Sequence, residues 1–169
     1  MKLSEAIVIV AKKEVGVEEK PRGSNRGPRV DEYLASTWMS KKEQAAGFPW
    51  CAAFVCFVVR EAMALAVVEE TKSFKRPRTA GAWDFENWSL AQDNSTQTKH
   101  KPGANDVQPG DIVIYTFSHI GIAISTANAD GMVRTIEANT DPAGSREGYM
   151  VAKRARHLRS IKARIRFTV

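Results

Sequence analysis

The sequence predicts one α+β domain over residues 1–169, in which N-terminal helices and a central cysteine-bearing helix pack on an antiparallel sheet of about five strands. Helical spacing of apolar residues dominates the first part of the chain, and alternation with a period of two dominates after Gly110. Helices followed by strands are typical of the α+β layout. A chain of 169 residues, 43% of them hydrophobic, is also long enough to bury a core without disulfide bonds.

The central element is expected to be a helix that begins near Cys51 and runs to about Glu70. Its apolar residues recur on nearly every side, which predicts a position in the centre of the core. A cysteine at a helix N-terminus meets free N–H groups and the positive end of the helix dipole, which favour a thiolate. Cys51 is therefore a candidate nucleophile, provided that a base and an orienting group come from elsewhere in the chain.

Shorter helices are expected on both sides of this central element. The opening amphipathic helix has Ser4 as a candidate cap, and Gly16 ends it. Polar residues interrupted by proline and glycine predict a long loop over 92–110. The predicted helices besides the central one span Leu3 to Val15, Arg29 to Trp38 and, as a short helix or packed turn, Ala80 to Leu90.

Strands are expected in the rest of the chain. The turn residues from Asn128 to Gly131 predict a hairpin between the second and third strands. The five predicted strands span Asp111 to Phe117, His119 to Thr126, Met132 to Glu137, Tyr149 to Ala155 and Ile161 to Phe167.

Two strand ends carry polar residues suited to acid–base chemistry. His119 begins one predicted strand, whereas Glu137 and Asn139 lie two residues apart at the end of another and are expected to face the same side of the sheet. A cysteine on a helix N-terminus, a histidine base and an orienting acid or amide together form a catalytic triad. Each residue alone is weak support, because a single buried cysteine is more often an inert small hydrophobe.

Four short segments follow one another in a specific order. They are Pro49-Trp50-Cys51-Ala52-Ala53-Phe54-Val55, Pro109-Gly110-Asp111-Ile112-Val113, Ser118-His119-Ile120-Gly121-Ile122-Ala123 and Thr135-Ile136-Glu137-Ala138-Asn139-Thr140. This order resembles the successive blocks of the CHAP family, the cysteine, histidine-dependent amidohydrolases/peptidases of the papain-like superfamily, which include phage-lysin-type peptidoglycan hydrolases. The similarity spans roughly residues 5 to 140, and it implies a papain-like fold and cleavage of an amide bond in the bacterial cell wall.

The resemblance implies catalytic roles for four residues. Cys51 would be the nucleophile, and His119 the general base that then protonates the leaving amine. Glu137 would orient the imidazole and stabilise its charged form, and Asn139 would assist in positioning. Trp50 is a candidate substrate-binding residue. The backbone N–H of Cys51 is expected in the oxyanion hole, whose second donor stays unassigned.

No cofactor and no metal are expected. Some family members carry an acidic calcium-binding loop before the cysteine, but the segment from Thr37 to Trp50 holds a single acid, Glu43. The sequence contains three histidines and neither a CxxC nor an HExxH pattern. An appended cell-wall-binding module is not expected either.

The remaining chemically reactive or charged residues have structural interpretations. Cys56 is expected in the core, while His100 and His157 are expected in water. Trp83 is expected to pack. In the basic C-terminal run, the alternation of Lys162, Arg164 and Arg166 predicts a solvated strand face, with attraction to an anionic envelope as the functional alternative.

The net charge of +6 points to anionic surroundings such as nucleic acid, anionic lipid or a bacterial envelope. The apolar run from Ala6 to Ala11 is too short and too closely flanked by charge for a signal peptide, and no run reaches transmembrane length. The chain is therefore expected to be synthesised in the cytoplasm without a signal peptide. It is expected to insert stably in no membrane and to act in the periplasm or on the cell wall after release or injection.

The favoured hypothesis is a peptidoglycan hydrolase, either an N-acetylmuramoyl-L-alanine amidase or a peptide endopeptidase. It would act as a phage lysin or as a secreted antibacterial effector, and an effector would have an immunity or inhibitor protein as a partner. The alternative is a catalytically inactive papain-like module that binds the wall or serves as a structural part. Nucleic-acid binding is not expected, because no recognition motif accompanies the basic charge.

Overall fold

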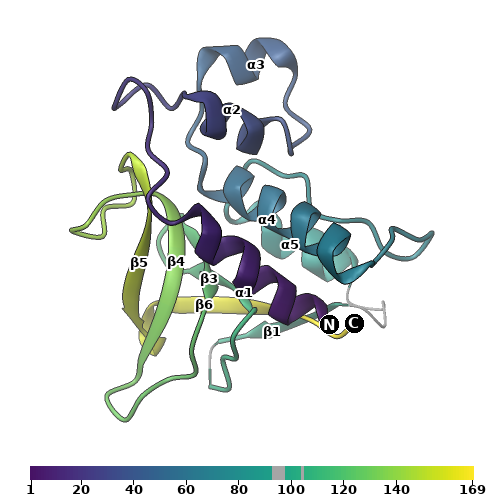
Figure 1. Ribbon diagram of the computed structural model, residues 1–169. Coiled ribbons are helices and arrows are strands. Elements are labelled where there is room, and N and C mark those ends of the chain that lie inside the picture. Colours follow the sequence, from purple (N-terminus) through teal and green to yellow (C-terminus); the bar gives the residue numbers. More distant parts are fainter. Residues whose placement is uncertain (93–97, 104) are drawn as a thin grey trace.

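The computed structural model, which describes residues 1–92, 98–103 and 105–169, packs helices on one six-stranded antiparallel sheet (Figure 1). The described residues form α1 (Leu3–Glu14), α2 (Pro28–Leu34), α3 (Lys41–Ala46), α4 (Cys51–Ala66), α5 (Asp84–Ala91) and a 3₁₀ turn (Leu158–Ser160). The strands are β1 (Thr98–Pro102), β2 (Ile112–Tyr115), β3 (Ile120–Ala123), β4 (Met132–Thr140), β5 (Met150–His157) and β6 (Ile161–Phe167), in the spatial order β1-β6-β2-β3-β4-β5. The predicted α+β class is confirmed.

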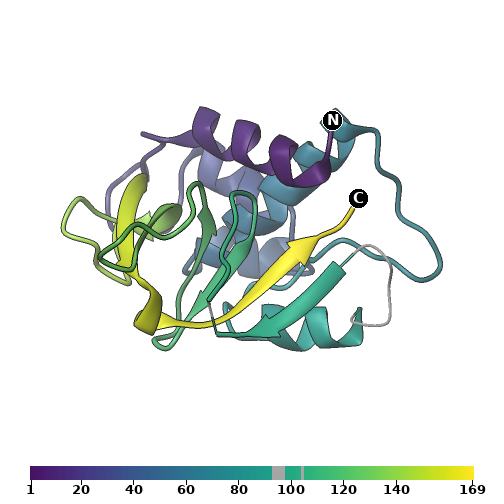
Figure 2. The same ribbon diagram turned by 90° about the horizontal axis from the view of Figure 1, so that it is seen from below.

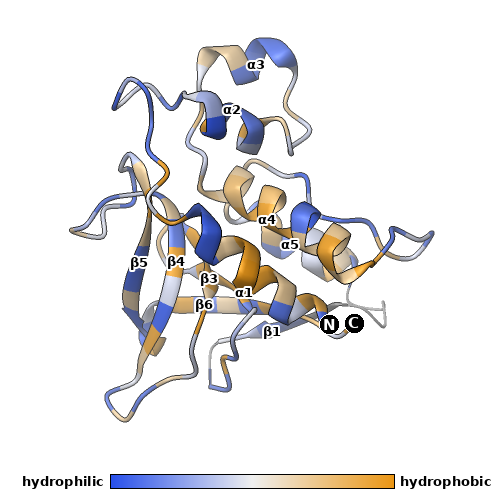
Figure 3. Ribbon diagram, in the orientation of Figure 1, coloured by the Kyte–Doolittle hydropathy of each residue, from blue (hydrophilic) through white to orange (hydrophobic). Residues whose placement is uncertain are grey.

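Helix α4 is the centre of the core, as its apolar residues predict. Every residue from Cys51 to Val59 is buried, and the helix packs between α1, α2 and strands β3 and β4 (Figure 3). Helix α1 runs along the same face of the sheet (Figure 2). The helix ends at Ala66 rather than near Glu70, because Val67 adopts the left-handed conformation at φ +56° and turns the chain away.

The central strands β2 and β3 are buried on both faces. Their isoleucines face the helices, whereas Val113, Tyr115 and Ala123 form a second, smaller apolar cluster with Val133 and Ile161 on the opposite face. Burial on both faces explains why these two strands read as continuous apolar runs. The hairpin predicted at 128–131 joins β3 to β4, with the Gly131 N–H donating to the Asn128 carbonyl at 3.0 Å.

Strand β1 lies inside the segment predicted as a long loop, and it raises the strand number to six. It pairs with β6 at the edge of the sheet, with His100 opposite Ile165. Its sequence, Thr-Lys-His-Lys-Pro, has no apolar alternation that would predict a strand. Lysine and proline are nevertheless typical of edge strands, where they discourage pairing with other chains. Residues 93–97 of the predicted loop lie outside the described residues.

The N-terminus of α1 also differs from prediction. Lys2 occupies the N-cap position instead of Ser4, and its backbone N–H donates to the Glu5 carboxylate at 3.2 Å. In the part of the chain that the structure describes, no helix has the length and apolar character needed to cross a bilayer.

Candidate active site

Cys51 is the first residue of α4 and lines a cleft, with 7% of its surface exposed. The chain reaches it through Gly47, which adopts φ +80°. A Cβ at Gly47 would lie 2.7 Å from the Ser24 carbonyl oxygen, so this close approach requires glycine. Because the Phe54 N–H donates to the Trp50 carbonyl, the three N–H groups before it belong to the first turn and have no acceptor within the helix.

Trp50, the N-cap residue of α4, is fully buried and does not line the cleft. Its indole Nε1–H donates to the Glu19 carboxylate at 2.8 Å, and its ring stacks on Tyr33 with 5.6 Å between the centroids. In the structure, Trp50 therefore supports the start of α4 from within the core and does not reach the surface of the cleft, where a substrate contact was expected. The aromatic side chain in the cleft wall is Phe48, two residues earlier.

His119 directly precedes β3 and is completely buried. A tight turn holds its backbone, with the His119 N–H donating to the Phe117 carbonyl at 2.6 Å. Its ring stacks with those of Tyr115 and Phe117, at centroid distances of 5.8 and 5.9 Å. The backbone turn and the ring stack together fix the orientation of the imidazole.

The Glu137 carboxylate, buried on β4, lies against this imidazole. Its Oε2 is 3.0 Å from His119 Nε2, and the Tyr115 hydroxyl donates to Oε1 at 2.7 Å. Arg156 on β5 holds the same carboxylate with two donors, Nε–H to Oε1 at 2.9 Å and Nη2–H to Oε2 at 2.5 Å. A Cβ at Gly121 would come within 2.8 Å of Glu137 Cγ, so a glycine opposite the carboxylate leaves the space that it occupies.

The two groups stabilise each other's charge. Burial opposes ionisation of Glu137, but hydrogen bonds from Arg156 and His119 outweigh it and lower the pKa of Glu137 to about 2. Burial also opposes charging of His119, yet the Cys51 side chain and the Glu137 carboxylate outweigh it and raise the pKa of His119 to about 9. An imidazolium–carboxylate pair is therefore the form expected near neutral pH.

The second ring nitrogen of His119, Nδ1, is the one available to Cys51. Glu137 occupies Nε2, and Nδ1 is buried without a hydrogen bond to any described residue. The Cys51 side chain nevertheless lies near enough to contribute to the raised pKa of His119. Catalytic pairs are often slightly separated before substrate binds. A thiol next to a charged, anchored imidazole can perform nucleophilic acyl chemistry.

Asn139 lines the cleft, and its Oδ1 makes no hydrogen bond to the imidazole. The β4–β5 register shifts between Glu137 and Thr140, and Asn139 adopts φ +53°, which asparagine tolerates better than most residues. This bulge breaks the strict alternation on which the prediction of a shared face depended. Asn139 is 1% exposed, and its Oδ1 is buried without a hydrogen-bond partner among the described residues.

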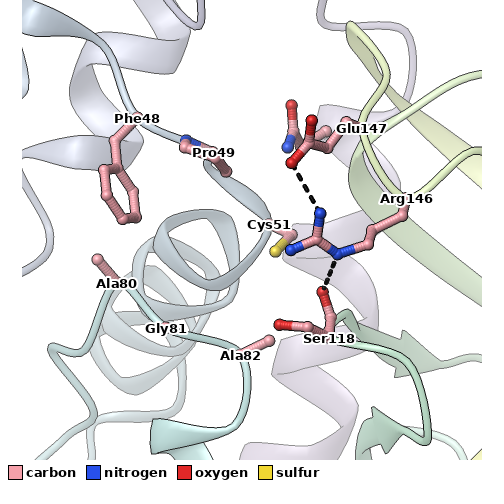
Figure 4. Close-up of a pocket in the computed structure, with 10 residues that line it drawn as sticks. Phe48, Pro49, Cys51, Ala80, Gly81, Ala82, Ser118, Arg146 and Glu147 are labelled. Carbon is pink, nitrogen blue, oxygen red and sulfur yellow. Dashed lines mark hydrogen bonds and ion pairs between the residues drawn. The ribbon is translucent and has the colours of Figure 1, made fainter.

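The cleft beside Cys51 encloses about 160 Å³ (Figure 4). Phe48 and Pro49 form one wall, residues 80–82 another, and Ser118, Asn139, Arg146 and Glu147 complete it. The residues thus come from the approach to α4 and its first residue, from the segment before α5, from the turn before β3, from the end of β4 and from the segment between β4 and β5. A volume of this size accommodates a segment about as large as one residue of an extended chain rather than a whole small-molecule ligand.

The family model described as CHAP domain matches residues 43–139, which include Cys51, His119 and Glu137. The chain belongs to the CHAP domain family.

A solved structure supports the papain-like fold of this CHAP domain. The crystal structure of the wild type endolysin LysIME-EF1 superposes with a TM-score of 0.52 at 15% sequence identity. The alignment covers 98% of this chain and 64% of that one, so this chain spans less than two thirds of the endolysin's length. No curated protein matches the sequence.

Other predictions about side chains of the CHAP domain need correction. His100 is not in water, because its side chain is largely buried and lies 3.2 Å from a Glu86 oxygen. The strand β6 arginines are not freely solvated, since Arg166 binds Asp111 and Arg164 is buried beside Asp106. Cys56 is buried as predicted, and burial raises the pKa of its thiol far above the ordinary value.

Sequence analysis did not identify Arg156 and Tyr115 as neighbours of Glu137. Arg156 belongs to a run of basic residues, and nothing in that run distinguishes an inward-facing arginine from a solvated one. Tyr115 lies in an apolar strand, and no local sequence motif distinguishes it from a core aromatic residue. The register of the β4–β5 pair is the signal that could have identified Arg156. Glu137 is paired with Ala152, and Arg156 lies four residues further along β5, within reach of a long side chain.

Proposed function

We propose that this CHAP domain is a peptidoglycan hydrolase that cleaves an amide bond of the bacterial cell wall with Cys51 as the nucleophile. The observation that carries the proposal is the row Cys51, His119, Glu137, in which the buried pair His119–Glu137 lies behind the one sulfur that opens to the cleft. Membership in the CHAP family and the fold shared with an endolysin point to the cell wall as the substrate.

In the proposed mechanism, the His119 imidazolium stabilises the Cys51 thiolate. The thiolate attacks the carbonyl carbon of the scissile amide, and the resulting oxyanion accepts hydrogen bonds from the free N–H groups at the start of α4, that of Cys51 included. The C–N bond then breaks as His119 donates its proton to the leaving amine. Water, deprotonated by the now neutral His119, hydrolyses the thioester and releases the acid.

Glu137 and Arg156 act through the imidazole. Glu137 fixes the ring so that Nδ1 faces Cys51 and stabilises the positive charge that the thiolate requires. Arg156 keeps the carboxylate ionised despite its burial. Asn139 contacts the substrate from the cleft wall in this proposal, because it lines the cleft and its Oδ1 has no hydrogen-bond partner among the described residues.

The scissile bond belongs either to an N-acetylmuramoyl-L-alanine linkage or to the peptide itself. The cleft suits an extended peptide in either case, because residues 80–82 in its wall have small side chains and leave their backbone accessible to a peptide. The fold shared with an endolysin favours action as a phage lysin over action as a secreted effector.

The test is mass spectrometry of purified peptidoglycan digested by the wild type and by Cys51→Ala. New amine and carboxyl or sugar ends only with the wild type are expected, and they would name the bond. Cys56→Ala is the matched control, because Cys56 is a buried cysteine of the same helix with its sulfur on the Thr79 carbonyl. Iodoacetamide should inactivate the wild type and the Cys56 variant alike.

Products from Cys51→Ala, or full activity after complete alkylation of Cys51, would remove this residue from the mechanism. Binding to the wall without any products, from several bacterial types and under reducing conditions, would instead support an inactive binding module.

A further inference from the structure

Arg146 is a cation in the cleft that the proposed mechanism does not use. It lies in the segment between β4 and β5, and its side chain reaches across toward the Cys51 sulfur (Figure 4). Its Nε–H donates to the Ser118 carbonyl at 3.0 Å, and its Nη1–H donates to the Glu147 carboxylate at 2.7 Å.

The position of the guanidinium is tied to the catalytic row. Ser118 directly precedes His119. The hydrogen bond to the Ser118 carbonyl therefore anchors the Arg146 guanidinium to the turn that also positions the imidazole. Among the residues that the structure describes, none accepts a hydrogen bond from Nη2, which leaves donors of a planar fork directed at the cleft. A guanidinium fork matches the two oxygens of a carboxylate.

Asn139 offers the second polar group of the same cleft. Its Oδ1 is buried and unpaired in the described structure, and an unpaired buried acceptor is satisfied when a ligand brings an N–H group. A carboxylate for Arg146 and an N–H for Asn139 are both present in an acidic residue of a peptide chain.

We propose that Arg146 and Asn139 form a specificity subsite that binds an acidic residue next to the scissile amide, the carboxylate on Arg146 and a peptide N–H on Asn139 Oδ1. This subsite rests on the proposed function, since it names the part of the wall peptide that the enzyme selects.

Glu147 explains how the subsite can be closed before substrate arrives. The Arg146–Glu147 pair is well exposed, with 50% and 63% of the two side chains accessible, and exposed ion pairs are held only weakly. A substrate carboxylate can therefore replace Glu147 on the guanidinium.

The experiment uses two synthetic wall peptides built around the bond that the digest identifies. They differ only in a carboxylate or a carboxamide on the residue flanking that bond. The wild type is expected to prefer the carboxylate peptide by about 5-fold in kcat/KM, the upper range for an ion pair with a half-exposed guanidinium. Arg146→Met should reduce this ratio to near one, and Arg146→Lys should keep part of it. Arg159→Met, an exposed arginine outside the cleft, is the control and should keep the full ratio.

Two results on cleaved peptides would overturn the subsite. The first is a wild type that shows no preference between the two peptides. The second is an Arg146→Met variant that loses activity on both peptides equally and keeps the native ratio of their kcat/KM values, as expected if Arg146 had a purely structural role. If whole peptidoglycan releases no products, the hydrolase proposal and the subsite fail together before any peptide is designed. If the wall is digested but neither peptide is cleaved, the hydrolase proposal stands and the subsite is refuted, because a carboxylate beside the bond does not suffice for recognition. Cleavage of both peptides at equal rates refutes the subsite alone.

Discussion

Glu137 accepts hydrogen bonds from four side chains, and their arrangement determines what this residue can do. Tyr115, Thr135 and the Nε–H of Arg156 donate to Oε1, while His119 and the Nη2–H of Arg156 bind Oε2. Both oxygens are therefore occupied, and the carboxylate can neither rotate nor take up a proton without losing a bond. Its negative charge is available to the imidazole over a wide pH range.

Replacing Arg156 by Met should narrow that range from the acid side. In the native chain, burial resists ionisation but Arg156 and His119 hold the pKa of Glu137 near 2, below its usual value. The stability from ionised Glu137 is therefore present above its unfolded pKa of about 4.5 and is lost as pH falls through about 2. Without the opposite charge, the acid limb of the kcat/KM profile should move up by about one to three pH units. Arg156→Lys should move it less.

The alkaline limb provides a reference within the same profile. Because His119 has its pKa raised to about 9, its contribution to stability is complete below about pH 6.5 and is lost as pH rises through 9, together with the imidazolium that catalysis requires. Arg154→Met is the matched control, since Arg154 lies on the same strand and binds the Pro142 carbonyl instead of Glu137. An unchanged acid limb in Arg156→Met would show that Arg156 does not tune the carboxylate.

The proximity of Cys51, His119 and Glu137, the residues of the proposed catalytic row, could be predicted because each lies in a local pattern that carries its own chemistry. Cys51 begins an apolar helix, and His119 and Glu137 lie at strand ends in segments resembling a known family. Arg156 and Arg146 could not be predicted in this way. Their roles depend on which of many basic side chains turns inward, and that is decided by strand register and by the path of the 141–149 segment.

At the level of elements, two aromatic residues flank the start of α4. Trp50 supports it from the core side, and Phe48 lies on the side of the cleft. Replacing Trp50 by Phe removes the Nε1–H and leaves a Glu19 oxygen buried without that donor. An unsatisfied buried acceptor costs about 1–3 kcal/mol, so the free energy of unfolding should fall by that amount in urea. KM should stay close to the native value, because the indole does not reach the cleft.

Phe48→Ala should give the opposite pattern. Phe48 is 43% exposed and lines the cleft, so its removal should raise KM and change the free energy of unfolding little. Urea titration and steady-state kinetics on both variants check the pair. A large rise of KM in Trp50→Phe with normal stability would restore Trp50 to the substrate groove.

The elements that sequence analysis missed share one physical reason, which is that hydrophobic periodicity was absent or broken. Strand β1 forms through backbone pairing with β6, and its own residues carry no alternation. The bulge at Asn139 inserts one residue into β4, and a period-two pattern cannot anticipate it. Where burial is continuous, as in α4, β2 and β3, the predicted elements agree with the structure within a few residues.

At the level of the whole molecule, β6 joins the end of the chain to its beginning. The Leu3 N–H donates to the Val169 carbonyl at 2.8 Å, and β6 pairs with both β1 and β2. We propose on this ground that residues 1–169 form a single domain. Arg166 of β6 adds two donors to the buried Asp111 carboxylate, at 2.8 and 2.7 Å, just before β2.

Replacing Arg166 by Met should therefore destabilise the entire fold. It leaves the buried Asp111 carboxylate with the Gln108 N–H as its remaining donor, at 2.9 Å, and losing a charged hydrogen-bond partner in this way costs about 2–3 kcal/mol. Lys162→Met on the same strand is the control, because its partner Glu86 keeps His100 and its own side chain is 44% exposed. Urea unfolding should show a large loss for Arg166→Met, about 1 kcal/mol or less for Lys162→Met, and one transition in each case. Equal losses would mean that Arg166 is solvated after all.

The proposed nucleophile and its proposed base belong to different layers of the molecule, Cys51 to the helices and His119 to the sheet. No hydrogen bond ties Nδ1 to the described residues, so the distance between sulfur and nitrogen is set by how the two layers pack. The catalytic rate is therefore expected to depend on the distance between the helix layer and the sheet. A core substitution far from the cleft that lifts α4 by a few tenths of an ångström would slow the enzyme while its stability and its circular dichroism stayed nearly normal.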